Sequence, residues 1–194
     1  MNRLISYRHD GIHWEADPRH AEILVSAYGV GGRQVTTPAS KDSAKEIENE
    51  EPLGKEGADL FRSSAARSQY LSEDRPDIKV ATRRLTRSMS SPSTLDEKNL
   101  KHEARFLAAR PRLVWHFPWQ RRVSRVTTWC DADHAGCLRT RKSTSGGALC
   151  LGSATMTTYC KGQGVIALSS GEAEFYVWPG QRNKSDTWNA QHAS

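Results

Sequence analysis

The stretch WCDADHAGCLRTRKSTSGG, residues 129–147, is the part of the sequence that decides the fold expected for the second half of the chain. Threonine, tryptophan and valine stand before its two aspartates, and residues 123–133 favour a β-strand. The aspartates, the histidine and the cysteines that follow leave three interpretations open. The stretch is a metal-dependent catalytic strand, a zinc site or a charged surface loop.

The elements predicted after this strand bear on the first interpretation. Residues 144–151 and 154–160 are typical of a hairpin around Gly152 and Ser153. Ser169 and Glu172 form a capping box that predicts a helix over 170–178. A strand, a hairpin and a helix in this order could bring Asp131 and Glu174 to one edge of a sheet.

Carboxylates placed in this way suit a hard cation. Mg²⁺ prefers carboxylate oxygens, and two such ions can activate a water and stabilise the leaving oxygen of a phosphodiester. Simpler alternatives are also open. Asp131 and Asp133 could sit in a turn, and Glu172 and Glu174 could be acids favoured by the dipole at a helix N-terminus.

The zinc interpretation needs four ligands from Cys130, His134 and Cys137 with Cys150 or Cys160. Their spacing lacks the paired C-x₂-C or H-x₃-H units of structural zinc sites. Cys130 and Cys150 fall on predicted strands, where a free cysteine behaves as a small apolar residue. The sequence therefore does not favour zinc.

The first half of the chain contains helical patterns. Residues 17–28, 77–89 and 95–109 predict helices, the first capped by Asp17 and the third by a box of Thr94 and Glu97. Residues 112–119 predict a strand. Residues 41–59 carry seven acidic and three basic side chains and predict a linker.

The overall composition indicates a soluble, intracellular protein, although it does not distinguish cytoplasm from nucleus. Hydrophobic residues make up 37% of the 194 residues, and four cysteines do not suggest a disulfide framework. The sequence shows neither a signal peptide nor an apolar run long enough to span a bilayer. We therefore expect no membrane partner.

The net charge of +6 is concentrated in residues 60–125, which carry fifteen Lys and Arg against six Asp and Glu. This excess indicates an anionic partner, an RNA–DNA hybrid or a duplex, contacted through phosphates. The alternative is a solvated helical face. No small-molecule substrate is expected. The candidate nucleic-acid-binding residues are Arg83, Arg84, Arg87, Lys101, Arg105, Arg121 and Arg122.

Three motifs in the second half, CDADHAG, TRKSTSGG and KGQGVIALSSGEAEFY, together resemble the ribonuclease H domain of Ty1/copia-type retrotransposon Pol polyproteins. Upstream, WEADPRHAEILVSAYGV and TTPASK resemble the end of the copia-type reverse transcriptase. The segment FRSSAARSQYLSEDRPDIKVATRRLTRSMSSPS resembles the connection between the two. The resemblance covers about residues 3–178.

This resemblance implies a hydrolase that cuts the RNA strand of a hybrid with Mg²⁺ or Mn²⁺. Asp131 matches the first metal-binding aspartate of the family, and Glu174 matches its helical glutamate better than Glu172 does. The family completes its site with two further acidic residues, and Asp186 is not accepted as one of them. No motif resembles the polymerase aspartates. The chain is therefore expected to be a polyprotein fragment with an incomplete site.

The expected fold class is α+β, with a helical connecting segment followed by a truncated ribonuclease H-like fold. That fold would be an antiparallel three-stranded unit and then a helix. The expected divisions are a reverse transcriptase remnant over 1–40, the acidic linker over 41–60, the connection over 61–120, the partial ribonuclease H-like domain over 121–178 and an unstructured tail over 179–194. Two functions remain open, a ribonuclease H relic inactive alone and a non-catalytic nucleic-acid-binding fragment.

Overall fold

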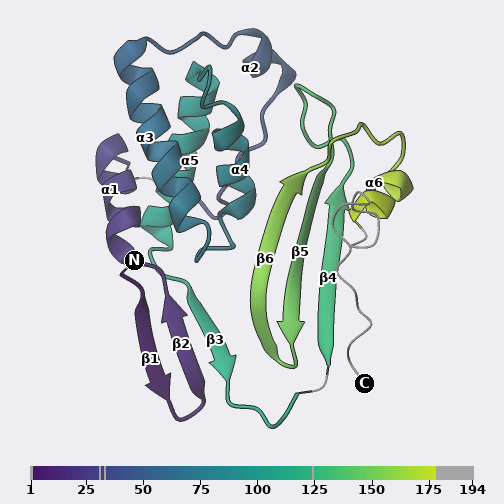
Figure 1. The fold of residues 1–194 in the computed structure, drawn as a ribbon. Helices are drawn as coiled ribbons and strands as arrows, with labels where there is room; N and C mark the ends of the chain where they lie inside the picture. The colour runs from purple at the N-terminus through teal and green to yellow at the C-terminus, as the bar shows by residue number, and fades with distance from the viewer. Residues whose placement is uncertain (1, 31, 33, 124, 178–194) are drawn as a thin grey trace.

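The computed structural model shows a mixed α+β fold, which confirms the expected class (Figure 1). It describes residues 2–30, 32, 34–123 and 125–177. Within these residues lie two three-stranded antiparallel sheets and six helices. The first sheet contains β1 (Leu4–Arg8), β2 (Gly11–Glu15) and β3 (Val114–Pro118), and the second contains β4 (Val126–Asp133), β5 (Thr144–Leu151) and β6 (Ala154–Gly162). The helices are α1 (Pro18–Tyr28), α2 (Ala44–Glu48), α3 (Lys55–Leu71), α4 (Lys79–Arg87), α5 (Thr94–Ala109) and α6 (Ser170–Val177).

The core of the molecule lies among the helices rather than between the sheets. Helices α1, α3, α4 and α5 pack side by side (Figure 1). Burial of their apolar faces removes hydrocarbon from water, which is the main force that holds such a bundle together. Two clusters of buried side chains fill it: Ala21, Leu24, Leu71, Ile78, Phe106 and Leu107 in one, and Phe61, Ala65, Leu85 and Leu100 in the other.

Local capping chemistry sets the ends of the helices largely as expected. The Asp17 carboxylate accepts a hydrogen bond from the Arg19 amide at the start of α1, and Gly29 ends this helix at a φ of 57°. The cap of α5 lies one residue earlier than expected. Ser93 and Asp96 form its capping box, in place of Thr94 and Glu97, because the Ser93 side chain reaches the third amide of the helix.

A polar junction joins the α3–α4 turn to the rest of the fold. Arg75 is 1% exposed, and its guanidinium donates to the Asp77 carboxylate and to the carbonyl oxygens of Arg110 and Pro111. A buried cation is stable only when its donors are satisfied in this way. The Arg-Pro-Asp-Ile segment therefore has a structural role, since Ile78 is also fully buried.

Strands β1 and β2 were not anticipated from the sequence, although Ile12 and Trp14 alternate with His13 and Glu15 as in a half-buried strand. Strand β1 pairs with β2 through a tight turn, and β2 pairs with β3 from Gly11 opposite Pro118 to Glu15 opposite Val114. The segment expected as the connection thus shares a sheet with the segment expected as the reverse transcriptase remnant. The Asp74 carboxylate accepts from Arg3 and Trp14, which fixes this sheet to the helices.

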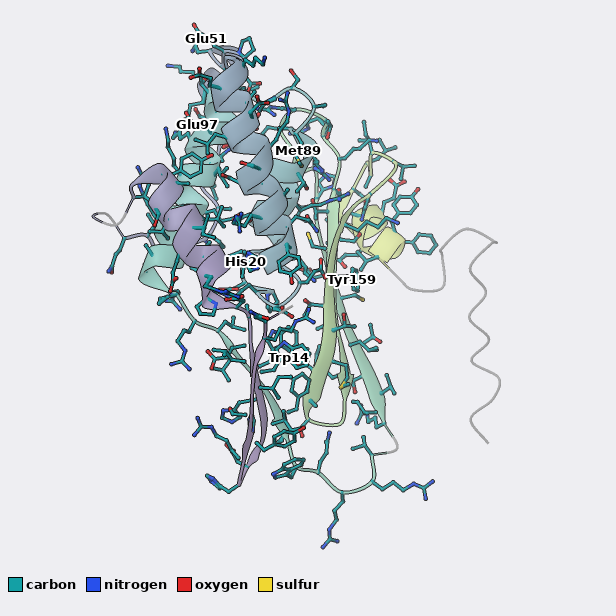
Figure 2. All side chains as sticks on the ribbon, turned by 60° about the vertical axis from the view of Figure 1, so that its left-hand side comes forward. Trp14, His20, Glu51, Met89, Glu97 and Tyr159 are labelled. Atoms are coloured by element: carbon teal, nitrogen blue, oxygen red, sulfur yellow. The ribbon has the colours of Figure 1, made fainter. Side chains whose placement is uncertain are left out.

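The second sheet and α6 follow the expected order of strand, hairpin and helix. Strand β5 lies between β4 and β6, with Asp131 opposite Gly146 and Gly146 opposite Cys160. One face of this sheet is turned to α4 and the other to α6 (Figure 2). On the first face Lys79 Nζ donates to the Thr158 carbonyl oxygen at 3.0 Å.

Two further expectations concern the acidic segment and the C-terminal tail. The acidic segment 41–60 contains α2 and the first residues of α3, so part of it is helical. The expected unstructured tail over 179–194 lies outside the described residues. No helix in the described part of the chain combines the length and the apolar character that a membrane span requires.

Candidate functional site

Strand β4 carries the first candidate residue, Asp131, with an exposed side chain. Directly opposed residues of neighbouring strands share a face of the sheet. Asp131 therefore shares a face with Gly146 and Cys160. Two residues further along, Asp133 pairs across the sheet with Thr144 and Gly162, and a Cβ on Gly162 would overlap the Arg87 guanidinium of α4. The Asp131 carboxylate thus leaves the sheet on the face turned to α4.

Helix α6 carries the second candidate residue, Glu174, which is also exposed. Gln163 anchors this helix to the opposite face of the sheet, because its Nε2 donates to the Ala173 carbonyl oxygen at 2.8 Å and to Ser145 Oγ at 3.0 Å. From there Glu174 Oε1 accepts the backbone N–H of Ala132 at 3.1 Å. Glu174 therefore reaches the backbone of β4 at Ala132, whereas the Asp131 carboxylate leaves the sheet on the opposite face, so the structure brings the two elements together but not the two carboxylates onto one face.

Glu172, the alternative glutamate, has a different role. Its amide donates to Ser169 Oγ at 3.1 Å, while its carboxylate accepts from the Leu168 amide at 2.7 Å and from the Tyr176 hydroxyl at 2.9 Å. These hydrogen bonds, the Leu168 amide first, lower the pKa of Glu172. The Glu172 side chain caps the N-terminus of α6, so of the two glutamates only Glu174 reaches β4.

Asp133 is held by the β4–β5 loop rather than by α6. Its carboxylate accepts the Thr144 amide, and a Cβ on Gly136 would overlap the same carboxylate. Ser143 closes the loop by accepting the Ala135 amide at 3.0 Å. Asp131 and Asp133 both lie in β4, so the alternative that they sit in a turn is wrong, although the Asp133 carboxylate holds the loop that follows the strand.

The cysteines and His134 do not gather as a zinc site would require. Cys130 precedes Ala132 by two residues and shares its face of the sheet, whereas Cys160 shares the face of Asp131. Among the described residues, these side chains do not bring three ligand atoms within 4.8 Å of one another. A structural zinc site needs four converging ligands.

The basic candidates separate into three places. Arg83, Arg84 and Arg87 lie on α4, with Arg83 half-buried and the other two exposed. Lys101 and Arg105 lie on α5, where Lys101 pairs with Glu97 at 3.0 Å. Arg121 and Arg122 are exposed in the loop between β3 and β4, at the far end of the molecule from α4 (Figure 1).

The three arginines of α4 line a cleft of about 550 Å³. Its other wall is the β4–β5 loop, so it lies between the helical bundle and the second sheet. Arg139, which sequence reasoning missed, joins them in the lining. It donates to Ser88 Oγ at 3.3 Å and pairs with Glu50 and with Asp96, the last at 3.4 Å. No local pattern signals Arg139, because only the tertiary fold brings this loop to α4.

The electrostatic character of this cleft is basic. Lys41, Arg83, Arg84, Arg87 and Arg139 line it against Asp42, Asp96 and Asp133, a net excess of two positive charges. Arg83 Nε is buried without a hydrogen-bond partner. A buried donor left unpaired costs free energy, and an anion in the cleft would lower that cost.

Comparisons with known proteins give one relationship. Over 117 residues the chain is 33% identical to the uncharacterized mitochondrial protein AtMg00810 of Arabidopsis thaliana. The match covers 59% of this chain and 48% of that protein, so the chain spans about half the length of this curated relative. No family model matches the chain. No solved structure matches it either.

Proposed function

We propose that the chain derives from a copia-type retrotransposon Pol polyprotein and joins the end of a reverse transcriptase to the first part of a ribonuclease H-like domain. The relationship to the Arabidopsis protein supports a retrotransposon-related origin. The order β4, β5, β6, α6 supports the ribonuclease H-like part, because the three motifs that carry the resemblance lie on these elements and the three strands form one sheet. The observation that supports this proposal most is the hydrogen bond from the Ala132 amide to Glu174 Oε1, because it links α6 to the residue that follows Asp131 on β4.

The metal that the family would use fits this pair only partly. Both side chains offer carboxylate oxygens, the donors that Mg²⁺ and Mn²⁺ prefer. One Glu174 oxygen, however, is committed to the Ala132 amide, and Asp131 leaves the sheet on the other side from α6. No third carboxylate, histidine or cysteine among the described residues joins them within 4.8 Å.

The consequence is a chain that is inactive alone. When bound, the ions of such sites activate a water and stabilise the leaving oxygen. Asp131 and Glu174 would orient at most one such ion, and loosely. Positioning and charge stabilisation supply most of the rate in phosphoryl transfer, so a loose site forfeits that rate.

The test uses a labelled RNA–DNA hybrid with Mg²⁺ or Mn²⁺. We expect no cleavage by the chain itself. A chimera that continues after Val177 with the remaining part of a copia-type ribonuclease H domain should cut the RNA strand. Asp131→Asn and Glu174→Gln should each abolish that cleavage.

The matched control is Glu172→Gln in the same chimera. Because Glu172 caps α6 and does not reach β4, this variant should keep cleavage and lose only some helix stability. Robust cleavage by the unextended chain that disappears in Asp131→Asn would refute the inactivity. Cleavage by the chimera that survives both site substitutions would refute the assignment of the site.

The second candidate function is nucleic-acid binding without chemistry, favoured by the cleft between α4 and the β4–β5 loop. Four arginines line it, and one of them has an unpaired buried nitrogen. Arginine binds phosphate oxygens with its planar array of donors. Binding of an RNA–DNA hybrid or duplex there would proceed through phosphates, with little dependence on base sequence.

A further inference from the structure

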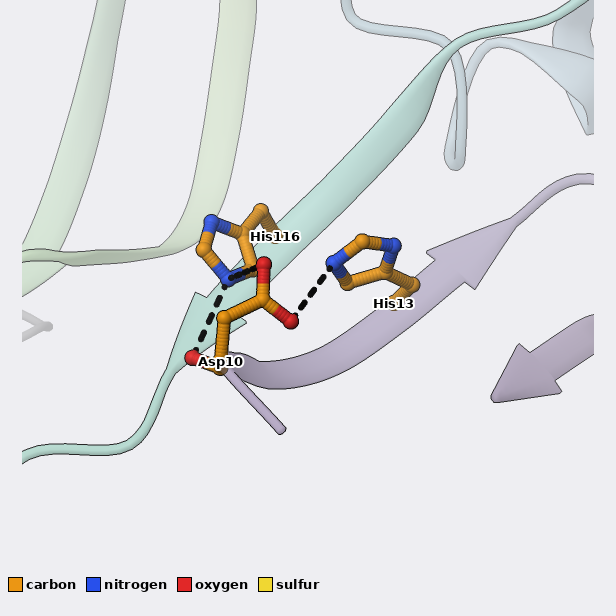
Figure 3. Close-up of side chains that lie close together, drawn as sticks. All are labelled: Asp10, His13 and His116. Carbon is orange, nitrogen blue, oxygen red and sulfur yellow. Dashed lines mark hydrogen bonds and ion pairs between the residues drawn. The ribbon is translucent and has the colours of Figure 1, made fainter. Parts of the chain in front are cut away.

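The strands β2 and β3 and the turn before β2 bring three metal-ligating side chains together beside the β1–β2 turn (Figure 3). His13 on β2 and His116 on β3 are direct partners across the sheet, and Asp10 belongs to the β1–β2 turn. The ligand atoms of the three residues all lie within 4.8 Å of one another. In the described part of the chain they are the one group of this kind.

The backbone holds Asp10 at this place. Gly11 follows it with a φ of 154°, and a Cβ there would lie 2.8 Å from the Pro118 Cα and would overlap the Phe117 carbonyl oxygen. The Asp10 carbonyl oxygen accepts the Trp119 amide at 3.1 Å. The close approach of Gly11 and the Trp119 hydrogen bond hold the turn against β3. The Asp10 carboxylate therefore lies next to both imidazoles.

The side-chain geometry is that of a chelating site. His13 Nε2 lies 3.5 Å from Asp10 Oδ1, and His116 Nε2 lies 3.6 Å from Asp10 Oδ2. Figure 3 shows both ring nitrogens turned toward the carboxylate. A tetrahedral zinc ion with bonds of about 2.0 Å separates its ligand atoms by about 3.3 Å. Small side-chain rotations would close the difference.

The ring nitrogen Nε2 of His13 is the second observation that points to a bound ligand. His13 Nε2 is buried without a hydrogen-bond partner, and its 3.5 Å contact with Asp10 Oδ1 is an ion pair that forms only when the imidazole is protonated. Buried polar atoms of this kind are rare and call for a ligand, a water or an ion. Of these, an ion would also contact the Asp10 carboxylate and His116 Nε2, which would exchange its 3.3 Å hydrogen bond with the Asp10 carbonyl oxygen for a bond to the metal.

We propose that Asp10, His13 and His116 bind a divalent transition metal of the zinc, cobalt or nickel class. Two imidazoles and one carboxylate suit these ions, whereas Mg²⁺ and Ca²⁺ prefer sites made of oxygen ligands alone. Three protein ligands leave one coordination position open to water. The ion would link the β1–β2 turn to β3 and so stabilise the first sheet. This site is independent of Asp131 and Glu174 and of the proposed ribonuclease H-like origin.

The experiment is a titration of the full chain with Zn²⁺ by calorimetry and with Co²⁺ by visible absorption, in excess Mg²⁺. We expect saturable binding of one ion per chain and a cobalt spectrum without thiolate charge-transfer absorption. Asp10→Asn, His13→Gln and His116→Gln should each weaken binding by at least ~10-fold. Asp10→Asn is the decisive variant, because it changes one exposed side chain conservatively, and circular dichroism of each apo variant checks the fold.

His134→Gln is the matched control, an exposed histidine in the β4–β5 loop that should leave Zn²⁺ affinity unchanged. Absence of saturable binding would overturn the proposal and leave a simple ion-pair cluster. Binding that survives Asp10→Asn but is lost in His134→Gln or after cysteine alkylation would overturn it in favour of the cysteine set around Cys137. Displacement of Zn²⁺ by Mg²⁺ would also count against it.

Discussion

At the scale of single residues, Glu103 is the most unusual side chain of the helical core. It is 1% exposed, and Ser68 and Thr82 donate their hydroxyl groups to its carboxylate. Burial raises the pKa of Glu103 to about 7, although these two hydrogen bonds oppose the shift. The carboxyl group is therefore more easily protonated in the folded chain than in the unfolded one, whose value is 4.5.

This shift predicts a pH-dependent stability. Between pH 4.5 and about 7 the folded state holds one proton more than the unfolded state, so the free energy of unfolding falls as the pH rises through this window. The loss is up to about 3 kcal/mol. Urea unfolding of wild type and Glu103→Gln across this range should show that the substitution removes most of the slope. Glu56→Gln, an exposed change at the start of α3, should keep the slope. Parallel slopes for wild type and Glu103→Gln would contradict the argument.

At the scale of elements, the β1–β2 hairpin depends on one glycine. Gly11 combines a φ of 154° with a close approach to the backbone of β3. Side chains rarely adopt that φ, and the approach leaves no room for a Cβ. The same residue fixes both the pairing of β2 with β3 and the position of Asp10.

We therefore predict that adding one methyl group at Gly11 destabilises the chain. Gly11→Ala should lower the free energy of unfolding by about 1–3 kcal/mol, because strain and overlap act together. Gly164→Ala is the control, since an added Cβ there has no atom within 4 Å and the residue is exposed. Thermal and denaturant unfolding measure both. Equal stability of the two variants would show that β1 and β2 add little to the fold.

At the scale of the whole molecule, polar contacts join the helical bundle to the second sheet. Lys79 reaches the Thr158 carbonyl oxygen, Arg87 lies against Gly162, and Arg139 pairs with Asp96 of α5. The basic cleft is a product of this junction. Charges that are scattered in sequence therefore act together only when both halves are assembled.

We predict that salt-dependent binding of nucleic acid depends on the arginines that line the cleft. Contacts with roughly four to six phosphates would make affinity for a hybrid fall steeply with salt. Arg84→Ala with Arg87→Ala should reduce the slope of log affinity against log salt by about two. Arg121→Ala with Arg122→Ala removes the same charge from the distant β3–β4 loop and should change the slope less. Fluorescence anisotropy at several salt concentrations measures both. Equal slopes for the two double variants would place the contacts outside the cleft, and binding indifferent to salt would exclude an electrostatic mode.

The elements that could be predicted from the sequence are those whose signals are local. Asp17 and Gly29 mark α1, Gly152 marks the β5–β6 turn, and the Ser169–Glu172 pair marks α6. Each signal acts within a few residues, where backbone geometry and one hydrogen bond suffice. The motif matches that single out Asp131 and Glu174 lie on these same local elements, and they stay predictions.

The contacts between distant segments, in contrast, could not be predicted from local patterns. Residues near position 12 pair with residues near position 117, and the Asp10, His13 and His116 cluster exists only through this pairing. The burial of Glu103 and the joining of Arg139 to the arginines of α4 depend in the same way on long-range packing. Strand pairing and core packing are decided by the free energy of the whole chain, because closing long loops is repaid only when many contacts form together.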